Sequence, residues 1–569
     1  MRRVVLFALI FAALAGTAEA ACPRGAQCGT VTVPLDHAGV TAGTLPLAYA
    51  RVPATGTRTG TIVFLSGGPG QAAVPLTEDV AAILRRVRAT HDLVTVDQRG
   101  TGDSGAVECE TVEECTERLG VRRAFYNTAE TAHDIENLRV ALGVDKLTLL
   151  GVSYGTKVAA EYARRYPDRT AAVVLDSPVP VDGLDALGQL RMLAAPRVLR
   201  EVCAPGLCSR TIEAPGETLA RAVARVRRRA VRGPFVNSAG RIRNLDVTES
   251  LVLSLFAESD ANPALRAGLP AALASLAAAG DAAPVLHLAE VTSELGNRAD
   301  INGARLLATV CTEGRLPWAP DSPLEPRQAA LEAYAAERAA TLAPFSARTL
   351  LEDSFPQLCT AWPPTPRPEP VAFAGPNVPV LILSGREDLR TPLEDARRTA
   401  AQYPNARLLA VPGVGHSVLR NDPTGCGRIG LIAFVRGQTV ANCSGPSLLT
   451  AAPYAPATIG ALRPTRFSGL PGRTLSALTV TLTGIAFDAA AHGRETFRLP
   501  GLRAGYVRAT RTALTLHDVE WIRGVRVSGG LDARSRGTVT VSGPNAAPGT
   551  VTYGPRGASG TLGGRAFTL

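Results

Sequence analysis

The chain has 569 residues, of which 46% are hydrophobic and 19% are charged, and its formal net charge is +10 at pH 7. This composition excludes a disordered or fibrous protein, and the length allows more than one globular domain. The positive charge does not indicate a nucleic-acid-binding protein, because the arginines are dispersed apart from one cluster at residues 225–233.

The first twenty residues have the pattern of a secretory signal peptide. Two arginines precede an apolar stretch, and small residues around Ala18 and Ala20 follow it. The stretch is too short to cross a membrane, and no later segment offers about 20 uninterrupted apolar residues. We therefore expect residues 1–20 to be removed and the protein to be secreted or to reach the periplasm or cell envelope. Lipid attachment at Cys22 is the alternative, but a leucine-like residue before it is missing.

The ten cysteines, an even number, indicate an oxidising compartment. Pairing neighbours along the chain predicts five disulfides: Cys22–Cys28, Cys109–Cys115, Cys203–Cys208, Cys311–Cys359 and Cys426–Cys443. A metal site is the alternative, but the sequence has no C-x-x-C pair with a nearby histidine cluster to support one.

Residues 21–180 alternate between strand-like and helix-like hydrophobic patterns. Short apolar runs such as "TIVFL", "LVTVD" and "DKLTLL" are typical of buried strands, and residues 129–143 predict an amphipathic helix that ends at a glycine. The alternation resumes at residues 373–445, with strands at "VPVLILSG" and "ARLLAVPG". Strands interleaved with helices predict a mostly parallel sheet covered on both faces, so we assign both segments to one α/β domain.

The residues between these two segments, 181–372, are rich in Ala, Leu and Arg with helical periodicity, and they predict an inserted helical cap. After Cys443 no cysteine occurs, and Thr, Gly and Pro alternate with apolar residues. We therefore predict a β-rich, all-β C-terminal domain over residues 446–569. Within it, "LTVTLTG" at residues 478–484 alternates apolar residues with threonines and is expected to form a strand.

A serine lies between two glycines in "GVSYGT", residues 151–156. A G-x-S-x-G match arises by chance about 0.3 times in a chain of this length and composition, so the motif alone decides little. Its context is more specific, because a strand ends at Gly151 and a helical pattern starts after Ser153. This is the strand, sharp turn and helix of a nucleophile elbow. We predict that Ser153 is a catalytic nucleophile; the alternative is a serine that caps the helix.

A catalytic serine needs a histidine base that a carboxylate orients, and in this arrangement the acid and then the histidine follow the serine along the chain. His416, in "AVPGVGHSV", lies in a loop just past a strand, whereas His492 and His517 belong to the C-terminal region. Asp388, in "VLILSGREDLRTP", also follows a strand, with Glu387 as the runner-up. We predict His416 as the base and Asp388 as the acid.

The oxyanion of the reaction intermediate needs backbone N–H donors that are in place beforehand. The segment "FLSGGPG", residues 64–70, follows a strand, precedes the elbow and offers glycines for close approach. We predict that the N–H groups of Gly67 and Tyr154 form the oxyanion hole. The alternative is an ordinary glycine turn.

Five segments together resemble the proline iminopeptidase and secreted tripeptidyl aminopeptidase group of α/β-hydrolases: "SGGPG", "DQRGTGDSG", "GVSYGT", "GREDLRTP" and "GVGH". The resemblance covers roughly residues 28–445, and the spacing of Cys426 and Cys443 is also similar. It implies an α/β-hydrolase fold, the triad and oxyanion hole predicted above, and no metal or organic cofactor. Ser66 departs from the His or Pro that relatives usually carry, and the group's pattern does not include the C-terminal domain.

An aminopeptidase must recognise the positively charged amine of its substrate. A carboxylate is the natural partner, because a desolvated ammonium is costly unless it is paired. The stretch "ATVCTEG" resembles one in which the tripeptidyl enzymes carry an acid just after a cysteine, so the resemblance implies this role for Glu313. An ordinary surface glutamate is the alternative.

The leading hypothesis is an exported serine exopeptidase of prolyl or tripeptidyl type. It would remove N-terminal units from peptides with a free N-terminus, through an acyl-enzyme on Ser153. The second hypothesis is a secreted carboxylesterase that uses the same triad. The third is a non-enzymatic binding protein on a hydrolase scaffold, with the C-terminal domain as its adhesive part. The sequence indicates no nucleic-acid partner, no transmembrane segment and no particular partner for the C-terminal domain.

Overall fold

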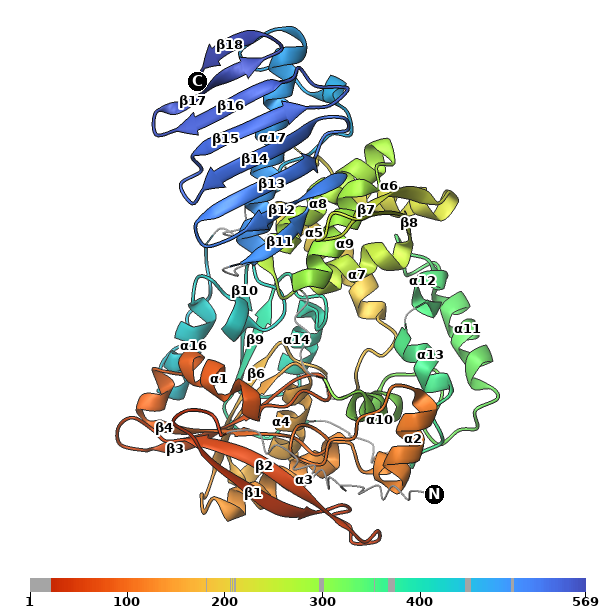
Figure 1. Cartoon of the computed structure of the whole chain (residues 1–569). Helices are drawn as coiled ribbons and strands as arrows, with labels where there is room; N and C mark the ends of the chain where they lie inside the picture. The colour runs from red at the N-terminus through yellow and green to blue at the C-terminus, as the bar shows by residue number, and fades with distance from the viewer. Residues whose placement is uncertain are drawn as a thin grey trace, which may run out of the picture.

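The computed structural model describes residues 22–180, 182–204, 206, 208, 211–295, 301–352, 354–366, 374–445, 452–492 and 496–569. The predicted signal peptide, residues 1–20, lies outside them. Figure 1 shows the chain as three parts, with a sheet of mixed direction at one end, a second sheet at the other end and helices between them. All five predicted disulfides are present, which confirms the predicted cysteine pairing.

The first sheet has eight strands in the order β1-β2-β4-β3-β5-β6-β9-β10. β1 and β2 pair antiparallel with their neighbours, and the six strands from β4 to β10 run parallel. Most of the parallel strands are buried along nearly their whole length, which explains their continuous Val, Leu and Ile runs. The predicted mostly parallel α/β sheet is confirmed. The strand bounds are β1 (Gln27–Pro34), β2 (Thr44–Val52), β3 (Gly60–Leu65), β4 (His91–Val96), β5 (Leu147–Val152), β6 (Thr170–Asp176), β9 (Val380–Gly385) and β10 (Ala406–Val411).

Helices cover both faces of this sheet. One hydrophobic cluster packs α3, α4 and α14 against one face, and a second packs α1 and α16 against the other. The predicted helix at residues 129–143 is α3, and the Asn127 side chain caps its first turn. The helices of this part are α1 (Thr77–Ile83), α2 (Val112–Leu119), α3 (Thr128–Ala141), α4 (Tyr154–Arg165), α14 (Leu393–Ala400), α15 (Val418–Asn421) and α16 (Cys426–Val435).

The chain between β6 and β9 is mainly helical and has a hydrophobic core of its own. It also contains a hairpin of β7 (Val231–Val236) and β8 (Ile242–Val247), which the sequence analysis does not predict. Glycine and proline inside β7 and the mostly exposed side chains of β8 weaken the alternating pattern that marks a strand. The helices are α5 (Gln189–Cys203), α6 (Pro215–Arg228), α7 (Glu249–Ser259), α8 (Pro263–Ala279), α9 (Ala283–Leu295), α10 (Gly303–Glu313), α11 (Arg327–Arg338), α12 (Ala347–Leu351) and α13 (Ser354–Thr360).

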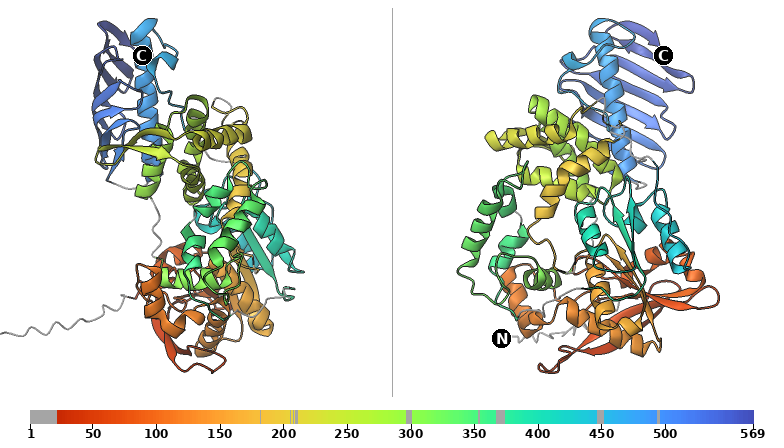
Figure 2. Two further views of the ribbon diagram at one scale, coloured as in Figure 1. Left: turned by 90° about the vertical axis from the view of Figure 1, so that its right-hand side faces the viewer. Right: turned by 180° about the vertical axis from the view of Figure 1, so that it is seen from behind.

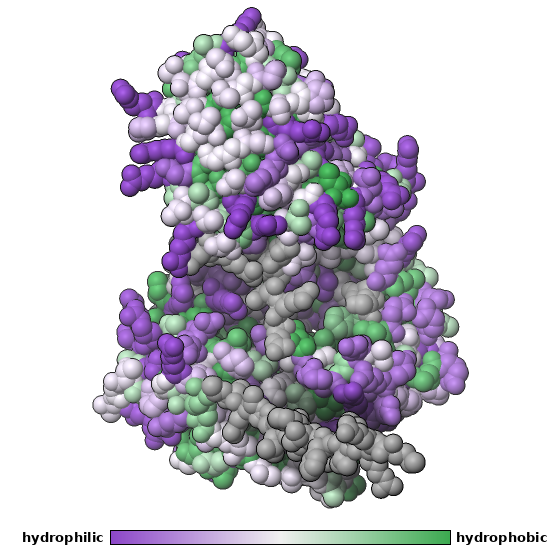
Figure 3. Space-filling view, in the orientation of Figure 1, coloured by the Kyte–Doolittle hydropathy of each residue, from purple (hydrophilic) through white to green (hydrophobic). Residues whose placement is uncertain are grey.

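The C-terminal part is an eight-stranded antiparallel sheet in which each strand pairs with the next along the chain. This sheet confirms that the C-terminal part is β-rich, but the expectation that it is all-β is wrong, because residues 469–492 form a helix. Its outward-facing positions carry polar side chains such as Arg508, Thr538 and Thr552, and Figure 3 shows this end of the surface mainly in white and purple. The strands are β11 (Phe497–Pro500), β12 (Ala504–Ala509), β13 (Ala513–Glu520), β14 (Arg526–Asp532), β15 (Gly537–Ser542), β16 (Gly549–Gly554), β17 (Gly557–Leu562) and β18 (Arg565–Thr568).

A long helix, α17 (Gly469–His492), lies along the other face of this sheet (Figure 2). The prediction of a strand at residues 478–484 is therefore wrong. The buried side chains are spaced by three or four positions, at Leu475, Leu478, Thr481 and Ile485, so packing against the sheet selects the helix over the two-residue alternation. The threonines are accommodated because the Thr481 hydroxyl donates to the carbonyl of Ala477, one turn earlier.

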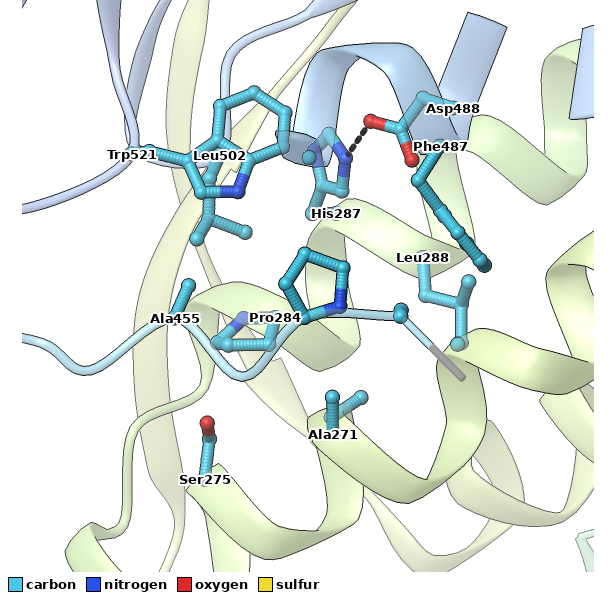
Figure 4. Close-up of a pocket in the computed structure, with 15 residues that line it drawn as sticks. Ala271, Ser275, Pro284, His287, Leu288, Ala455, Phe487, Asp488, Leu502 and Trp521 are labelled. Atoms are coloured by element: carbon cyan, nitrogen blue, oxygen red, sulfur yellow. Dashed lines mark hydrogen bonds and ion pairs between the residues drawn. The ribbon is translucent and has the colours of Figure 1, made fainter. Parts of the chain in front are cut away.

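The C-terminal sheet and α17 are attached to the cap helices. His287 of α9 forms a buried hydrogen bond of 2.8 Å with Asp488 of α17, and the Trp521 ring packs edge-on against His287 (Figure 4). Arg503 and Asp281 form a second, largely buried ion pair of 2.6 Å across the same junction. Among the described helices, none combines the length and the apolar character needed to span a bilayer.

Candidate active site

Ser153 lies between the end of β5 and the start of α4, and its backbone is strained. Its φ of 55° and ψ of −124° are rare for a residue other than glycine. The side chain makes no capping hydrogen bond to α4, which argues against the helix-cap alternative. The backbone N–H donates to the carbonyl of Asp176 at 2.9 Å, so the end of β6 holds the turn in place. The sequence thus forms a sharp strand-to-helix turn with the serine at its apex.

The glycines around Ser153 are required by close backbone contacts. A Cβ atom on Gly155 would overlap the carbonyl of Leu65 in the neighbouring strand, and one on Gly151 would overlap the carbonyl of Gly155. Any larger residue at either position would push α4 away from the sheet. The G-x-S-x-G spacing is therefore a packing requirement of this turn.

Asp388 and His416 are in contact, although 28 residues separate them. The first follows β9 and the second follows the adjacent strand β10, so both lie at the carboxyl edge of the sheet, where β5 also ends. His416 Nδ1 lies 3.0 Å and 3.2 Å from the two carboxylate oxygens of Asp388. The Thr391 hydroxyl donates to the same carboxylate at 2.9 Å. Because Nδ1 faces Asp388, Nε2 is the ring nitrogen that remains available for proton transfer.

The electrostatics of this pair favour a charged imidazole. Burial opposes the imidazolium of His416, but the Asp388 carboxylate outweighs it and raises the pKa of His416 above its usual value. Burial likewise opposes ionisation of Asp388, but His416 and the hydrogen bonds from Thr391 outweigh it and hold the pKa of Asp388 below its usual value. A histidine in this setting can accept a proton readily.

Two other acids beside the pair are engaged elsewhere. Glu387, the runner-up acid, forms a buried ion pair of 2.5 Å with Arg266. The sequence analysis does not predict a role for Asp176, the last residue of β6. Like Asp388, which lies shortly after β9, it is an acid at the carboxyl end of a strand. Its carboxylate accepts hydrogen bonds from the N–H groups of Val418 and Leu419, at 2.8 Å and 2.9 Å. Asp176 thus fixes the loop that carries His416 and also, through its carbonyl, the backbone of the serine.

The predicted oxyanion donors lie beside the serine. A Cβ atom built on Gly67 would be 2.9 Å from the Cβ of Ser153 and 3.4 Å from its Oγ, so the loop after β3 passes directly next to the hydroxyl. Within the described residues, the N–H groups of Gly67 and Tyr154 donate no hydrogen bond to a protein acceptor. Tyr154 is the first residue of α4, where an amide has no partner inside the helix. Both amides are free to bind a negatively charged oxygen.

The "DQRG" segment after β4 positions this loop. The Asp97 carboxylate accepts hydrogen bonds from the N–H groups of Ala73 and Val74, at 2.7 Å and 2.8 Å. The Gln98 side chain donates to the carbonyl of Ser66 at 2.9 Å, next to Gly67. The segment therefore supports the serine indirectly, by fixing the loop on which Gly67 lies.

We expect Gly67→Ala to lower kcat by about 10²-fold, which is a typical loss for one damaged oxyanion contact. The added methyl group would meet the Cβ of Ser153 at 2.9 Å, so either the loop or the serine must shift. Steady-state kinetics would measure the change. Gly460→Ala is the matched control, because a Cβ there has only Thr458 Oγ1 nearby, at 4.0 Å, and its rate should equal that of the unchanged protein. Normal kcat in Gly67→Ala would contradict the assignment.

Glu313, at the end of α10, lies in a different setting from the predicted one. Its carboxylate is almost fully buried and pairs with Lys157 of α4 at 2.5 Å. It also accepts hydrogen bonds from the N–H and hydroxyl of Thr128, at 2.6 Å and 2.5 Å. Burial opposes its ionised form, but Lys157 and Thr128 hold the pKa of Glu313 below its usual value. The carboxylate is therefore occupied by protein groups, which argues against the role in binding a substrate amine.

A pocket of about 430 Å³ opens beside the serine turn. It lies between α1, the ends of β3 and β5, and the start of α15, and Gly67 and Ser417 form part of its wall. Most of its lining is apolar, including Phe64, Leu76 and Leu150. Gly67 borders both this pocket and Ser153, so the pocket lies next to the loop that passes the serine.

Comparison with known proteins yields two family models that match this chain. One, described as "alpha/beta hydrolase fold", covers residues 60–201, and the other, described as "TAP-like protein", covers residues 343–442. The two matches include the Ser153 turn and the Asp388 and His416 loops respectively.

Curated relatives include serine protease Hip1 of Mycobacterium tuberculosis, which is 34% identical over 190 residues, or 28% of this chain and 36% of that protein. Tripeptidyl aminopeptidase of Streptomyces lividans is 33% identical over 193 residues, with the same coverage of both chains. These matches span about a third of each relative. Carboxylesterase B of Mycobacterium tuberculosis is 28% identical over 452 residues, or 70% of this chain and 81% of that protein.

Among solved structures, the esterase RhEst1 from Rhodococcus sp. is 15% identical with a TM-score of 0.33, and the match covers 73% of this chain and all of that one.

Proposed function

We propose that this chain, an α/β-hydrolase related to the tripeptidyl aminopeptidase group, is a serine exopeptidase that removes short N-terminal units from peptides. The single observation that carries the proposal is that the strained Ser153 turn and the Asp388–His416 pair lie at one edge of the sheet, where the amides of Gly67 and Tyr154 have no acceptor among the described residues. The names of two relatives, a serine protease and a tripeptidyl aminopeptidase, support a peptide substrate.

In the proposed reaction, Ser153 Oγ attacks the scissile carbonyl while His416 accepts its proton at Nε2. Asp388 holds the imidazole by Nδ1 and stabilises the imidazolium. The N–H groups of Gly67 and Tyr154 stabilise the oxyanion. The imidazolium then protonates the leaving amine, and a water molecule activated by His416 hydrolyses the acyl-enzyme, which restores the serine.

We further propose that the protein acts outside the reducing cytoplasm. Five disulfides bind all ten cysteines, and such bonds persist mainly in secreted and periplasmic proteins. The signal pattern in residues 1–20 supports the same location.

A secreted carboxylesterase is the second candidate function. A relative that is aligned over 70% of this chain is named carboxylesterase B. An esterase would use the same serine, histidine and acid, because both reactions pass through an acyl-enzyme and a tetrahedral oxyanion. The two candidates differ in whether a free substrate amine contributes to binding.

A set of three substrates separates the two functions: a short peptide anilide with a free amine, its N-acetylated form and a nitrophenyl ester. For an exopeptidase we expect acetylation to lower kcat/KM by about 30-fold or more, which corresponds to the roughly 2 kcal/mol or more lost when a buried charge pair is broken. Equal rates for the free and acetylated anilides, together with rapid ester hydrolysis, would refute the exopeptidase and favour the esterase.

A further inference from the structure

We propose that Asp260 and Arg266, at the corner between cap helices α7 and α8, are positioning residues for the catalytic triad. This corner fixes the backbone of the loop that carries Asp388 and of the loop that carries His416, so the cap has a role beyond covering the site. The inference rests on the triad of the proposed function, but it does not depend on which substrate is hydrolysed.

Asp260 is fully buried and holds the loop that carries the acid. One of its carboxylate oxygens accepts hydrogen bonds from the N–H groups of Leu389 and Arg390, each at 2.9 Å. The Arg390 N–H also lies 2.9 Å from a carboxylate oxygen of Asp388. The two carboxyl groups therefore share one donor. The second oxygen of Asp260 is buried without a hydrogen-bond partner in the described structure.

Arg266 connects the same corner to both catalytic loops. Its guanidinium is 1% exposed and pairs with Glu387, the residue before the acid, at 2.5 Å. It also donates to the carbonyl of Gly413 at 3.0 Å, three residues before the histidine. A further bond of 3.0 Å to the carbonyl of Asp260 closes the corner itself. One buried side chain thus ties together three segments that are far apart in the sequence.

The loop that carries His416 packs closely against this corner. A Cβ atom on Gly415 would overlap the carbonyl of Asp260 and would lie 2.7 Å from a guanidinium nitrogen of Arg266. The residue before His416 therefore packs directly on the cap. Since a shift of about 1 Å in a catalytic group can cost about 10²-fold in rate, contacts this close can control the Asp388–His416 geometry.

The charge of Asp260 also acts on the triad. The charged groups that face it are Asp388, Arg390 and His416, with Arg266 bound to its carbonyl. Burial and the neighbouring Asp388 raise the pKa of Asp260 to about 7. Where Asp260 is ionised, it favours the imidazolium and thereby contributes to the raised pKa of His416. Removing this charge should lower the pKa of His416 and move the acid limb of activity to lower pH.

The test compares Asp260→Ala, Asp260→Asn and the control Glu258→Gln by their rates of labelling with a fluorophosphonate from pH 5 to 9. Glu258 lies two residues earlier, is half exposed and lies 3.5 Å from the Arg390 guanidinium, so its variant should match the unchanged protein. We expect Asp260→Ala to label about 10- to 100-fold more slowly. Asp260→Asn should recover most of this rate, because its amide oxygen can accept the same two N–H bonds.

The pH profile distinguishes positioning of the triad from general support of the fold. We expect the midpoint of the acid limb in Asp260→Asn to fall by about half a pH unit or more, whereas a loss of stability alone would not move it. An unchanged midpoint, or an Asp260→Ala variant that labels at the original rate, would overturn the inference. If Asp260→Ala does not fold, as thermal unfolding would show, the midpoint of Asp260→Asn decides alone.

The labelling rate also separates this inference from the proposed function. An unchanged protein that labels at Ser153 but cleaves no peptide would refute the exopeptidase and leave the comparison of variants valid. An unchanged protein that does not label would refute the triad and this inference with it.

Discussion

Ser153→Ala is expected to lose hydrolysis of every substrate by about 10⁴- to 10⁶-fold, the size of effect seen when a catalytic serine is removed. The variant lacks the attacking oxygen, so no acyl-enzyme can form. Alanine tolerates the backbone conformation of Ser153 about as well as serine does, and the N–H bond to the Asp176 carbonyl is kept, so the unfolding temperature should change little. Initial rates with the free-amine anilide and the nitrophenyl ester, together with thermal unfolding, would measure both effects.

The matched control is Ser559→Ala, which removes a hydroxyl from an exposed position of β17 in the C-terminal sheet. Its rate should remain within about two-fold of the original, as expected for a surface substitution. A Ser153→Ala protein that retains a tenth or more of the original activity would show that another nucleophile performs the reaction.

Asp388→Asn is expected to lower kcat by about 10⁴-fold with little change in KM. The amide keeps the shape of the buried side chain and the hydrogen bond from the Thr391 N–H, but it can present an NH₂ group to Nδ1 of His416. The imidazole would then carry its proton on Nε2, where a base must be free to accept one. The loss of the carboxylate also lowers the pKa of His416, because Asp388 contributes most to raising it.

The pH dependence of activity provides a second test of Asp388→Asn. In the unchanged protein, activity requires neutral His416 and should fall as the pH drops through its raised pKa. In Asp388→Asn the residual activity should persist to lower pH. Glu394→Gln is the control, since this acid lies on α14 nearby, is partly exposed and pairs with Arg197. A normal kcat in Asp388→Asn would contradict the assignment of the acid.

The serine turn was predictable from the sequence because its determinants are local. The strand, the two glycines and the helix occupy consecutive positions. Each glycine is required because a Cβ atom there would overlap the backbone of the turn or of the adjacent strand. The contact between Asp388 and His416 was predictable for a related reason, since each follows a strand of the same parallel sheet and the carboxyl ends of such strands lie at one edge.

Other features depend on contacts between distant residues that no local pattern encodes. Glu313 follows a cysteine as expected, but its partner Lys157 belongs to a helix 156 positions earlier. The strand predicted at residues 478–484 is part of helix α17, because the alternation of threonines and apolar residues is local, whereas the helical spacing of the buried side chains depends on packing against the C-terminal sheet. Asp260 and Arg266 belong to no recognisable motif, and only the fold brings them to the loops that carry Asp388 and His416.

The most direct test of the account is to treat the intact protein with a fluorophosphonate and to locate the adduct by mass spectrometry. We predict a single modified residue, Ser153, because its strained turn lies at the edge of the sheet that also carries the Asp388–His416 pair, and Gly67 passes directly beside its hydroxyl. Labelling should be absent in Ser153→Ala and strongly slowed in Asp388→Asn. An intact protein that forms no adduct, or that carries the adduct on another residue while Ser153 stays unmodified, would contradict it.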